Sequence, residues 1–318
     1  VLFMGFFASL INSMPSAVAQ GLIWGIMAIG VYLTYRILDV ADLTVDGSLG
    51  TGGAVCVVMV LNGVPVGLAL LAATAAGMLA GLVTGLFHTA CGIPAILAGI
   101  LTQLALYSVN LRIMGFGTGG GKANLPISVD KYSLLVSARY VRNVALNNPI
   151  LILAIFCAVL IAVLYWFFGT ELGCSLRATG ANQNMARAQG INTNVTKVLG
   201  LMISNGLVAL AGGLLAQYQG FSDINMGRGA IVIGLAAVII GEVIFSRIFR
   251  NFALKLLSAV IGAIIYYIVM VFVLRLGLST DDLKLLTALV VALFLTIPYW
   301  KGKYFTNTSV KKGEKNHA

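Results

Sequence analysis

Charged residues are scarce in this sequence. Only 9% of the 318 residues are Asp, Glu, Lys or Arg, whereas 59% are hydrophobic and the mean hydropathy is +0.99. A soluble domain carries about 25% charged residues, so a chain of this length cannot cover a water-exposed surface with so few charges. The apolar runs show no strict alternation, which favours membrane-spanning helices over a closed barrel. The composition therefore predicts an integral membrane protein and excludes a soluble enzyme.

Acidic residues are fewer still, at 10 against 20 basic residues, which gives a net charge of +10. In a soluble protein this excess would suggest nucleic-acid binding. Here the basic residues lie mostly between and beyond the apolar runs, where they set the orientation of membrane segments. We therefore expect a lipid bilayer, and no nucleic acid, as the partner of this chain.

Metal-binding and nucleotide-binding patterns are also missing. The two histidines are far apart in sequence, and none of the four cysteines forms a Cys-x-x-Cys pair, so we expect no metal site. The segment closest to a phosphate-binding loop, residues 117–123, has Phe116 where the first glycine belongs and Ala123 in place of the hydroxyl residue that binds Mg²⁺. No cofactor is expected on this chain.

Nine apolar segments could cross a bilayer as helices. They cover residues 16–37, 46–63, 65–87, 93–114, 149–168, 196–218, 229–246, 252–274 and 283–300. We expect an all-α polytopic integral membrane protein with about nine transmembrane helices (range about eight to ten), in one membrane domain over residues 1–300. Residues 1–14 are apolar but short, so we expect an interfacial helix there. Residues 301–318 form a basic tail that the positive-inside rule places in the cytoplasm, together with segment 169–197.

The second apolar segment differs from its neighbours because small and polar residues crowd its start. Short or broken helices of this kind often line transport paths near the middle of a membrane. The alternative is a solvated cytoplasmic turn in which an aspartate caps the helix. The candidate pathway residues are Asp42, Thr44, Asp46, Ser48 and Thr51.

The third segment carries Gly77, Gly81 and Gly85 at intervals of four residues. This spacing places the three glycines on one helix face, where a neighbouring backbone can approach closely. We interpret it as a packing feature.

A polar segment, residues 172–192, connects two apolar segments on the side expected to face the cytoplasm. Asn182 can cap a short helix, and Gly190 suits the left-handed residue that ends one. The pattern predicts about two turns of helix. Such a ridge could dock into a soluble partner, or it could be an ordinary connector.

This segment resembles the cytoplasmic coupling segment of ABC importer permeases of the branched-chain amino acid and ribose type. The resemblance rests on Arg-Ala-Thr-Gly-Ala-Asn at residues 177–182 and Gly-Ile-Asn at residues 190–192. Asp-Leu-Thr-Val at 42–45 and Ala-Gly-Gly at 211–213 are similar to further family patterns, and the resemblance extends over about residues 16–300.

The resemblance implies a permease that has no motor of its own and works as a homodimer or half of a heterodimer in the bacterial cytoplasmic membrane. ATP and Mg²⁺ would be bound by a separate cytoplasmic ATP-binding subunit, and an extracellular solute-binding protein would deliver the solute. The first expectation for the solute is a branched-chain or aromatic amino acid, with sugars and nucleosides as alternatives. The expected ATPase-coupling residues are Arg177, Gly180, Ala181, Asn182, Met185, Ala186, Arg187, Gly190, Ile191 and Asn192.

The connection 115–148 is long and is expected to lie outside the cell. Its basic residues Lys131, Arg139 and Arg142 could dock an acidic surface of the solute-binding protein. The alternative is an interfacial amphipathic helix.

Glu242 departs from the family pattern, which often has Gly-Gly where this chain has Gly241 and Glu242. A salt bridge with a nearby arginine, Arg247 or Arg250, is the simple interpretation. Acids inside a membrane could also serve an ion-coupled secondary transporter, which is the alternative function, and a membrane scaffold or sensor is a third.

Overall fold

The structure is a computed structural model. It describes residues 2–116, 120–128, 131–132, 134–141, 148–245, 248–249 and 251–275, with a few single positions between 285 and 296, and side chains from residue 12 onward. Its elements are α1 (Leu2–Tyr32), the π-helical turn η1 (Leu33–Ile37), α2 (Val45–Leu61), α3 (Val66–Thr89), α4 (Ala95–Met114), β1 (Asn124–Pro126), the 3₁₀ turn η2 (Ala138–Tyr140), α5 (Pro149–Gly169), α6 (Glu171–Ala181), α7 (Gln183–Ala188), α8 (Thr193–Gln219), β2 (Phe221–Asp223), α9 (Ala230–Phe245) and α10 (Phe252–Arg275).

The described residues include six helices long and apolar enough to cross a membrane. These are α3, α4, α5, α8, α10 and the segment Asn12–Ile37 of α1 and η1, while α2 and α9 are apolar but shorter. The prediction of an all-α, multi-pass membrane protein is confirmed. The ninth expected segment, 283–300, lies mostly outside the described residues, and the tail 301–318 lies entirely outside them.

The N-terminal residues do not form a separate helix. The backbone of α1 is helical from Leu2 through Pro15 to Tyr32, so the expected short helix at residues 1–14 is the first part of a longer helix, and its placement at the membrane interface stays a prediction. A proline inside a membrane helix is tolerated because neighbouring groups satisfy the backbone that it leaves unpaired.

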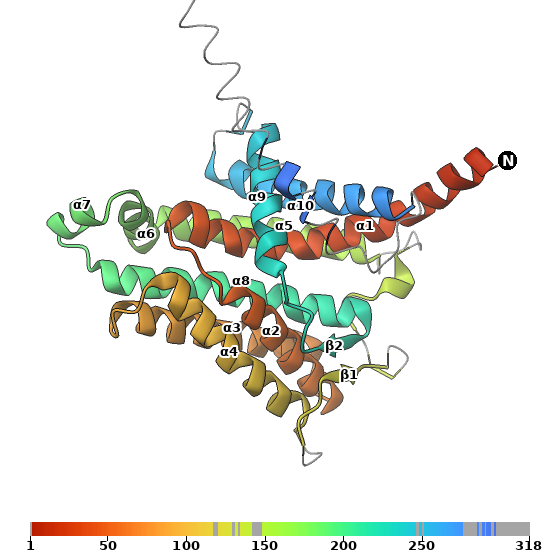
Figure 1. The fold of residues 1–318 in the computed structure, drawn as a ribbon, viewed down its shortest axis with the longest axis horizontal. Coiled ribbons are helices and arrows are strands. Elements are labelled where there is room, and N and C mark those ends of the chain that lie inside the picture. The colour runs from red at the N-terminus through yellow and green to blue at the C-terminus, as the bar shows by residue number, and fades with distance from the viewer. Residues whose placement is uncertain are drawn as a thin grey trace, which may run out of the picture.

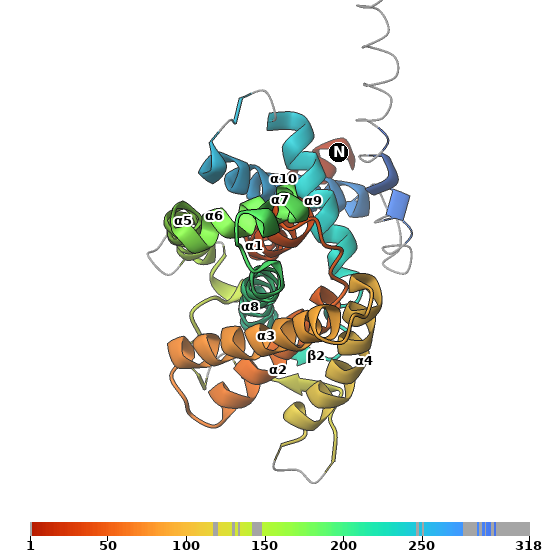
Figure 2. The same ribbon diagram turned by 90° about the vertical axis from the view of Figure 1, so that its left-hand side faces the viewer.

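Helix α8 lies at the centre, against α1 on one side and α2 and α3 on the other (Figures 1 and 2). The expected close approach along the third segment is confirmed. A Cβ added at Gly77 would collide with the carbonyl oxygen of Asn205, and one at Gly81 with that of Leu201. The missing side chains therefore let α3 and α8 pack backbone against backbone.

The two ends of the molecule differ in structure. Helices α6 and α7 occupy one end, seen on the left of Figure 1 and called here the α7 end. At the other, the β-strand end, β1 pairs antiparallel with β2 so that Leu125 lies opposite Ser222. Since α5 runs from η2 to α6, η2 also lies at the β-strand end.

Candidate translocation site and coupling segment

Two short helices begin near the middle of the molecule and run in opposite directions. After η1 the chain turns back, and α2 starts beside the midpoint of α8, where Ser48 donates to Asn205 at 2.6 Å (Figure 1). From there α2 runs toward the β-strand end, whereas α9 leads away from α2 and crosses α1, and its residue Glu242 meets Arg36 of η1. Discontinuous helices of this kind are typical of transporter binding sites.

Asp42 is buried, with 3% of its surface exposed, and both its oxygens have partners. Oδ1 accepts from the Thr44 backbone at 2.9 Å, and Oδ2 accepts from the Asn205 side chain at 2.6 Å. Asn205 in turn accepts from Ser48. A buried carboxylate is costly unless hydrogen bonds satisfy it, so this network explains how the acid is accommodated and how α2 is fixed to α8.

The hydroxyl groups near Asp42 form a second buried chain. Thr44 and Thr84 lie 2.7 Å apart between their hydroxyl oxygens, and Thr84 donates to Thr102 at 2.9 Å. Thr51 donates to the Gly47 carbonyl of its own helix. The structure therefore places four of the five candidate pathway residues inside the helix bundle of this chain, where their contacts connect α2, α3, α4 and α8. Their role in transport stays a prediction.

The fifth candidate, Asp46, stabilises the start of a different helix. Its carboxylate accepts from the backbone amides of Gly229 and Ile231, each at 2.9 Å. These amides belong to the first turn of α9, so the negative charge compensates the positive N-terminal end of that helix. A capping aspartate was anticipated at this point of the chain, but as the cap of its own helix in a solvated turn.

Asp46 also lines a cavity of about 390 Å³ between α2, α4 and the segment that connects β2 to α9. Sequence reasoning missed most of this site, because Arg228 falls between two expected apolar segments and the α4 residues fall inside the expected span 93–114. Gln103, Tyr107 and Asn110 recur on one face of α4 at intervals of three or four residues, which was the available signal. The lining residues are Asp46, Gly47, Gln103, Leu104, Tyr107, Asn110, Ile224 and Arg228.

The predicted short helix at the α7 end is present as α7. Asn182 caps it by accepting from the amides of Asn184 and Met185 at 3.0 and 3.1 Å, and Gly190 follows it with a φ of +82°. Met185 is 55% exposed at the tip, whereas Ala186 is buried beneath it. Figure 1 shows α7 protruding beyond α1 and α8, so its outer face is open to a partner.

Several residues of the coupling motif hold the segment together. A Cβ at Gly180 would collide with the Ile37 carbonyl, and Asn192 caps α8 by accepting from Asn194 and Val195. Arg187 donates to Thr193 at 2.8 Å. Among the predicted coupling residues the exposed ones are Arg177, Ala181, Asn182, Met185, Arg187, Gly190 and Asn192, while Gly180 and Ile191 are half-buried.

Two of the three basic residues expected to dock a binding protein, Lys131 and Arg139, lie at the β-strand end. Lys131 is exposed and lies over the Tyr132 ring at 5.7 Å from its centre. Arg139 is exposed on η2, and Arg142 lies outside the described residues. In the described part of 120–141 the one helical element is the single turn η2.

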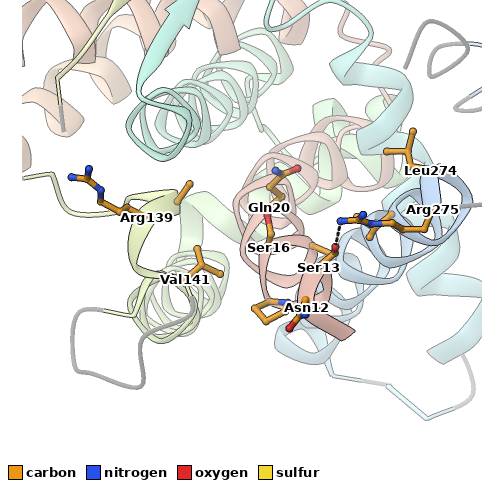
Figure 3. A pocket seen from close by; sticks show the side chains of 12 residues that line it. Asn12, Ser13, Ser16, Gln20, Arg139, Val141, Leu274 and Arg275 are labelled. Atoms are coloured by element: carbon orange, nitrogen blue, oxygen red, sulfur yellow. Dashed lines mark hydrogen bonds between the residues drawn. The ribbon is translucent and has the colours of Figure 1, made fainter. Parts of the chain in front are cut away.

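Beside η2 is a cavity of about 730 Å³ between α1, α10 and η2 (Figure 3). Arg275 reaches across it to Ser13 at 2.5 Å, whereas the Arg139 guanidinium points away from α1.

Glu242 forms the expected salt bridge with a different arginine. Its Oε1 accepts from Arg36 Nε at 2.8 Å, which ties α9 to η1. Arg247 and Arg250, the partners named from sequence proximity, lie outside the described residues. No group of three or more potential metal ligands was found within the described part of the chain.

Comparison with known proteins identifies the family. Residues 13–297 match the family model described as the permease component of the branched-chain amino acid transport system. The chain belongs to this family. The predicted ABC importer permease is therefore confirmed, and family membership implies an ATP-binding subunit and a solute-binding protein as partners.

Three named permeases are similar to this chain in sequence. It is 41% identical to the tyrosine transport system permease protein of Clostridioides difficile over 282 residues, which cover 88% of this chain and 89% of the relative. It is 28% identical to the ribose import permease protein of Escherichia coli over 73% of this chain and 69% of that protein. The autoinducer 2 import system permease protein of Salmonella typhi is 29% identical over 69% of this chain and 59% of its own length.

The fold also resembles a solved structure, PsaBC from Streptococcus pneumoniae in complex with Fab. The TM-score is 0.51 at 16% identity, with 95% of the permease and 99% of that chain covered. At this level of identity the likeness supports the fold alone.

Proposed function

We propose that the permease imports an aromatic amino acid, with tyrosine as the first candidate. The observation that carries this proposal is the 41% identity to the tyrosine transport permease over nearly the full length of both chains. The ribose and autoinducer 2 permeases are less similar and are matched over smaller parts of this chain. Branched-chain amino acids are the next candidates because the family description names them.

The proposed assembly is a homodimer of the permease in the bacterial cytoplasmic membrane. ATP and Mg²⁺ would be held by a separate ATP-binding subunit, as family membership implies. A binding protein would deliver the solute at the β-strand end, where its acidic side chains could meet Lys131 and Arg139. Arg142, which lies outside the described residues, stays a predicted third contact. No chemical change of the solute is part of this function.

The ATP-binding subunit would dock on α7. Its exposed side chains Met185 and Arg187 offer one apolar contact and one charge, while Asn182 and Gly190 fix the ends of the helix. Closure of the ATP-binding subunits would push on α7, and the membrane helices would respond by a rigid-body change between outward- and inward-facing states.

The acidic residues Asp42, Asp46 and Glu242 do not support ion-coupled transport. The carboxylates of Asp42 and Asp46 accept hydrogen bonds from Asn205, Thr44 and the first turn of α9, and Glu242 pairs with Arg36. Each acid thus has a structural partner that explains its presence without an ion.

The test is transport by the reconstituted assembly. The permease is co-expressed with candidate ATP-binding and solute-binding subunits from the same organism, and ATP-dependent uptake of tyrosine, leucine and ribose into proteoliposomes is compared. We expect tyrosine to be preferred. Saturable uptake of ribose without uptake of any amino acid would overturn the proposal.

The docking of α7 is tested with Met185→Glu. We expect the buried charge to reduce co-purification of the ATP-binding subunit. The control is Phe116→Glu, which alters a more exposed apolar side chain, 78% exposed, at the β-strand end. Equal co-purification of both variants would show that α7 is not the docking element.

A further inference from the structure

The cavity beside Asp46 contains a buried polar atom with no partner. Asn110 is 2% exposed, yet its Oδ1 accepts no hydrogen bond, and its Nδ2 makes one long contact of 3.5 Å with the Gly47 carbonyl. Asn110 lines the cavity. Leaving a buried acceptor unsatisfied is unfavourable, so a turn of the Asn110 side chain that presents this oxygen to a donor in the cavity would be favoured.

The same cavity holds one acid and one base that do not meet. Asp46 and Arg228 both line it, but within the described part of the chain Arg228 forms no ion pair. The Asp46 carboxylate accepts two backbone hydrogen bonds and retains lone pairs for further donors. A ligand that carries both a positive and a negative charge would therefore find an oppositely charged side chain for each of them in this cavity.

An aromatic surface lies next to the base. The Arg228 guanidinium is 5.8 Å from the centre of the Tyr107 ring, and Leu104 and Ile224 add apolar lining. A flat ring can stack against this surface, and the Gln103 amide offers a polar group for a hydroxyl. The volume of about 390 Å³ falls within the range of small-molecule pockets.

The position of the cavity is one where a solute could bind on its way through the permease. It lies where α2 and α9 begin, on the half of α4 that leads to the β-strand end, and Figure 2 shows α4 and α9 on the same side of the molecule. In transporters, the ends of short helices near the middle of the bundle commonly surround the transported solute.

We propose that this cavity is a solute subsite that binds an aromatic amino acid as its zwitterion. Arg228 binds the carboxylate, Asp46 and the Oδ1 atom of Asn110 accept from the ammonium group, and the side-chain ring stacks on Tyr107. The inference rests on the proposed import of an aromatic amino acid and adds a recognition site on the permease itself.

The test is direct binding in the absence of the binding protein. The permease and its ATP-binding subunit are placed in lipid nanodiscs, and equilibrium binding of tritiated tyrosine is measured with tyramine and hydroxyphenylpropionate as competitors. Tyramine lacks the carboxylate, and hydroxyphenylpropionate lacks the ammonium group. ATP-driven tyrosine uptake is measured on the same proteins.

The expected result is a different loss for each variant. Arg228→Ala weakens tyrosine binding by about tenfold or more, as for a lost charged hydrogen bond, and leaves tyramine binding unchanged. Asn110→Leu weakens tyrosine and tyramine but not hydroxyphenylpropionate. Arg112→Ala, an exposed arginine on α4 that does not line this cavity, is the matched control and binds all three as the wild type does.

Two controls keep the result interpretable. Each variant is checked for a single gel-filtration peak, Asn110→Ser replaces Asn110→Leu if the latter does not fold, and Arg228→Lys is expected to restore part of the carboxylate preference.

Equal losses for tyrosine and tyramine in Arg228→Ala would overturn the proposal. So would a wild-type complex that imports tyrosine but does not bind it here, and the proposed function would then still stand. A wild-type assembly that neither binds nor imports any aromatic amino acid would overturn the proposed function together with the subsite.

Discussion

The carboxylate of Asp46 on α2 accepts a hydrogen bond from the Gly229 amide at 2.9 Å, although the two residues are 183 positions apart. With the second bond from Ile231, it joins the beginnings of two helices that run in opposite directions. Each of these helices is shorter than the membrane spans around it, so this contact holds the bundle together at its middle.

Asp46→Ala should destabilise the protein by about 0.5–2 kcal/mol, because it removes a helix cap. Thermal unfolding of the detergent-solubilised permease measures the effect. Glu171→Ala, at an exposed position in the first turn of α6, is the control and should change stability by less than about 0.5 kcal/mol. Equal shifts for the two variants would contradict a capping role for Asp46.

Asn205→Leu should lower the stability of the protein more than a substitution in the hydroxyl chain of Thr44, Thr84 and Thr102. It removes the Asn205 partner of both Asp42 and Ser48 in a buried site, and each group left unsatisfied costs about 1–3 kcal/mol, with more for the charged carboxylate. Thr102→Val removes one neutral hydroxyl and should cost about 1–3 kcal/mol. Folded yield and thermal unfolding compare the two, and a Thr102→Val variant that is the less stable would refute this ranking.

Gly81→Leu should prevent normal packing of α3 on α8. Its side chain would enter the space occupied by the Leu201 carbonyl, and overpacking of a tight contact costs about 1–3 kcal/mol or more. Gly67→Leu in the same helix has open space around it and should be tolerated. The yield of monodisperse protein after solubilisation checks the difference.

Asn182→Ala should loosen α7 without unfolding the membrane helices. Hydrogen exchange at the amides of Asn184 and Met185 should accelerate, by about the 5- to 30-fold that a loss of 1–2 kcal/mol implies. The exposed neighbour Asn184, changed to Ala, supplies the control. If exchange is unchanged in Asn182→Ala, the cap does not stabilise α7 in solution.

The sequence alone located most of the membrane helices, because apolar length is a local property of the chain. The expected segment 149–168 corresponds to α5 at Pro149–Gly169, and 252–274 to α10 at Phe252–Arg275. The ends of α7 were also predictable, since Asn182 and Gly190 act on backbone groups within a few residues of themselves.

The rest depended on contacts between distant parts of the chain. Glu242 was expected to pair with arginines a few residues away, but it meets Arg36, 206 positions earlier. Arg228 was not singled out from the sequence, because the folding back of the chain before α9 has no local sequence signal. For the same reason the cavity of Asp46, Asn110 and Arg228 could not be anticipated from any one segment.

Helix α9 can also be regarded as a rigid rod about 24 Å long, given 1.5 Å per residue over its 16 residues. One end is held by Arg36, next to Ile37, against which Gly180 packs. The other end is held by Asp46 at the cavity. Helix α9 is thus held near both ends through an acidic side chain, since its own Glu242 pairs with Arg36 and Asp46 of α2 caps its first turn, so a displacement of either contact would be passed along the helix.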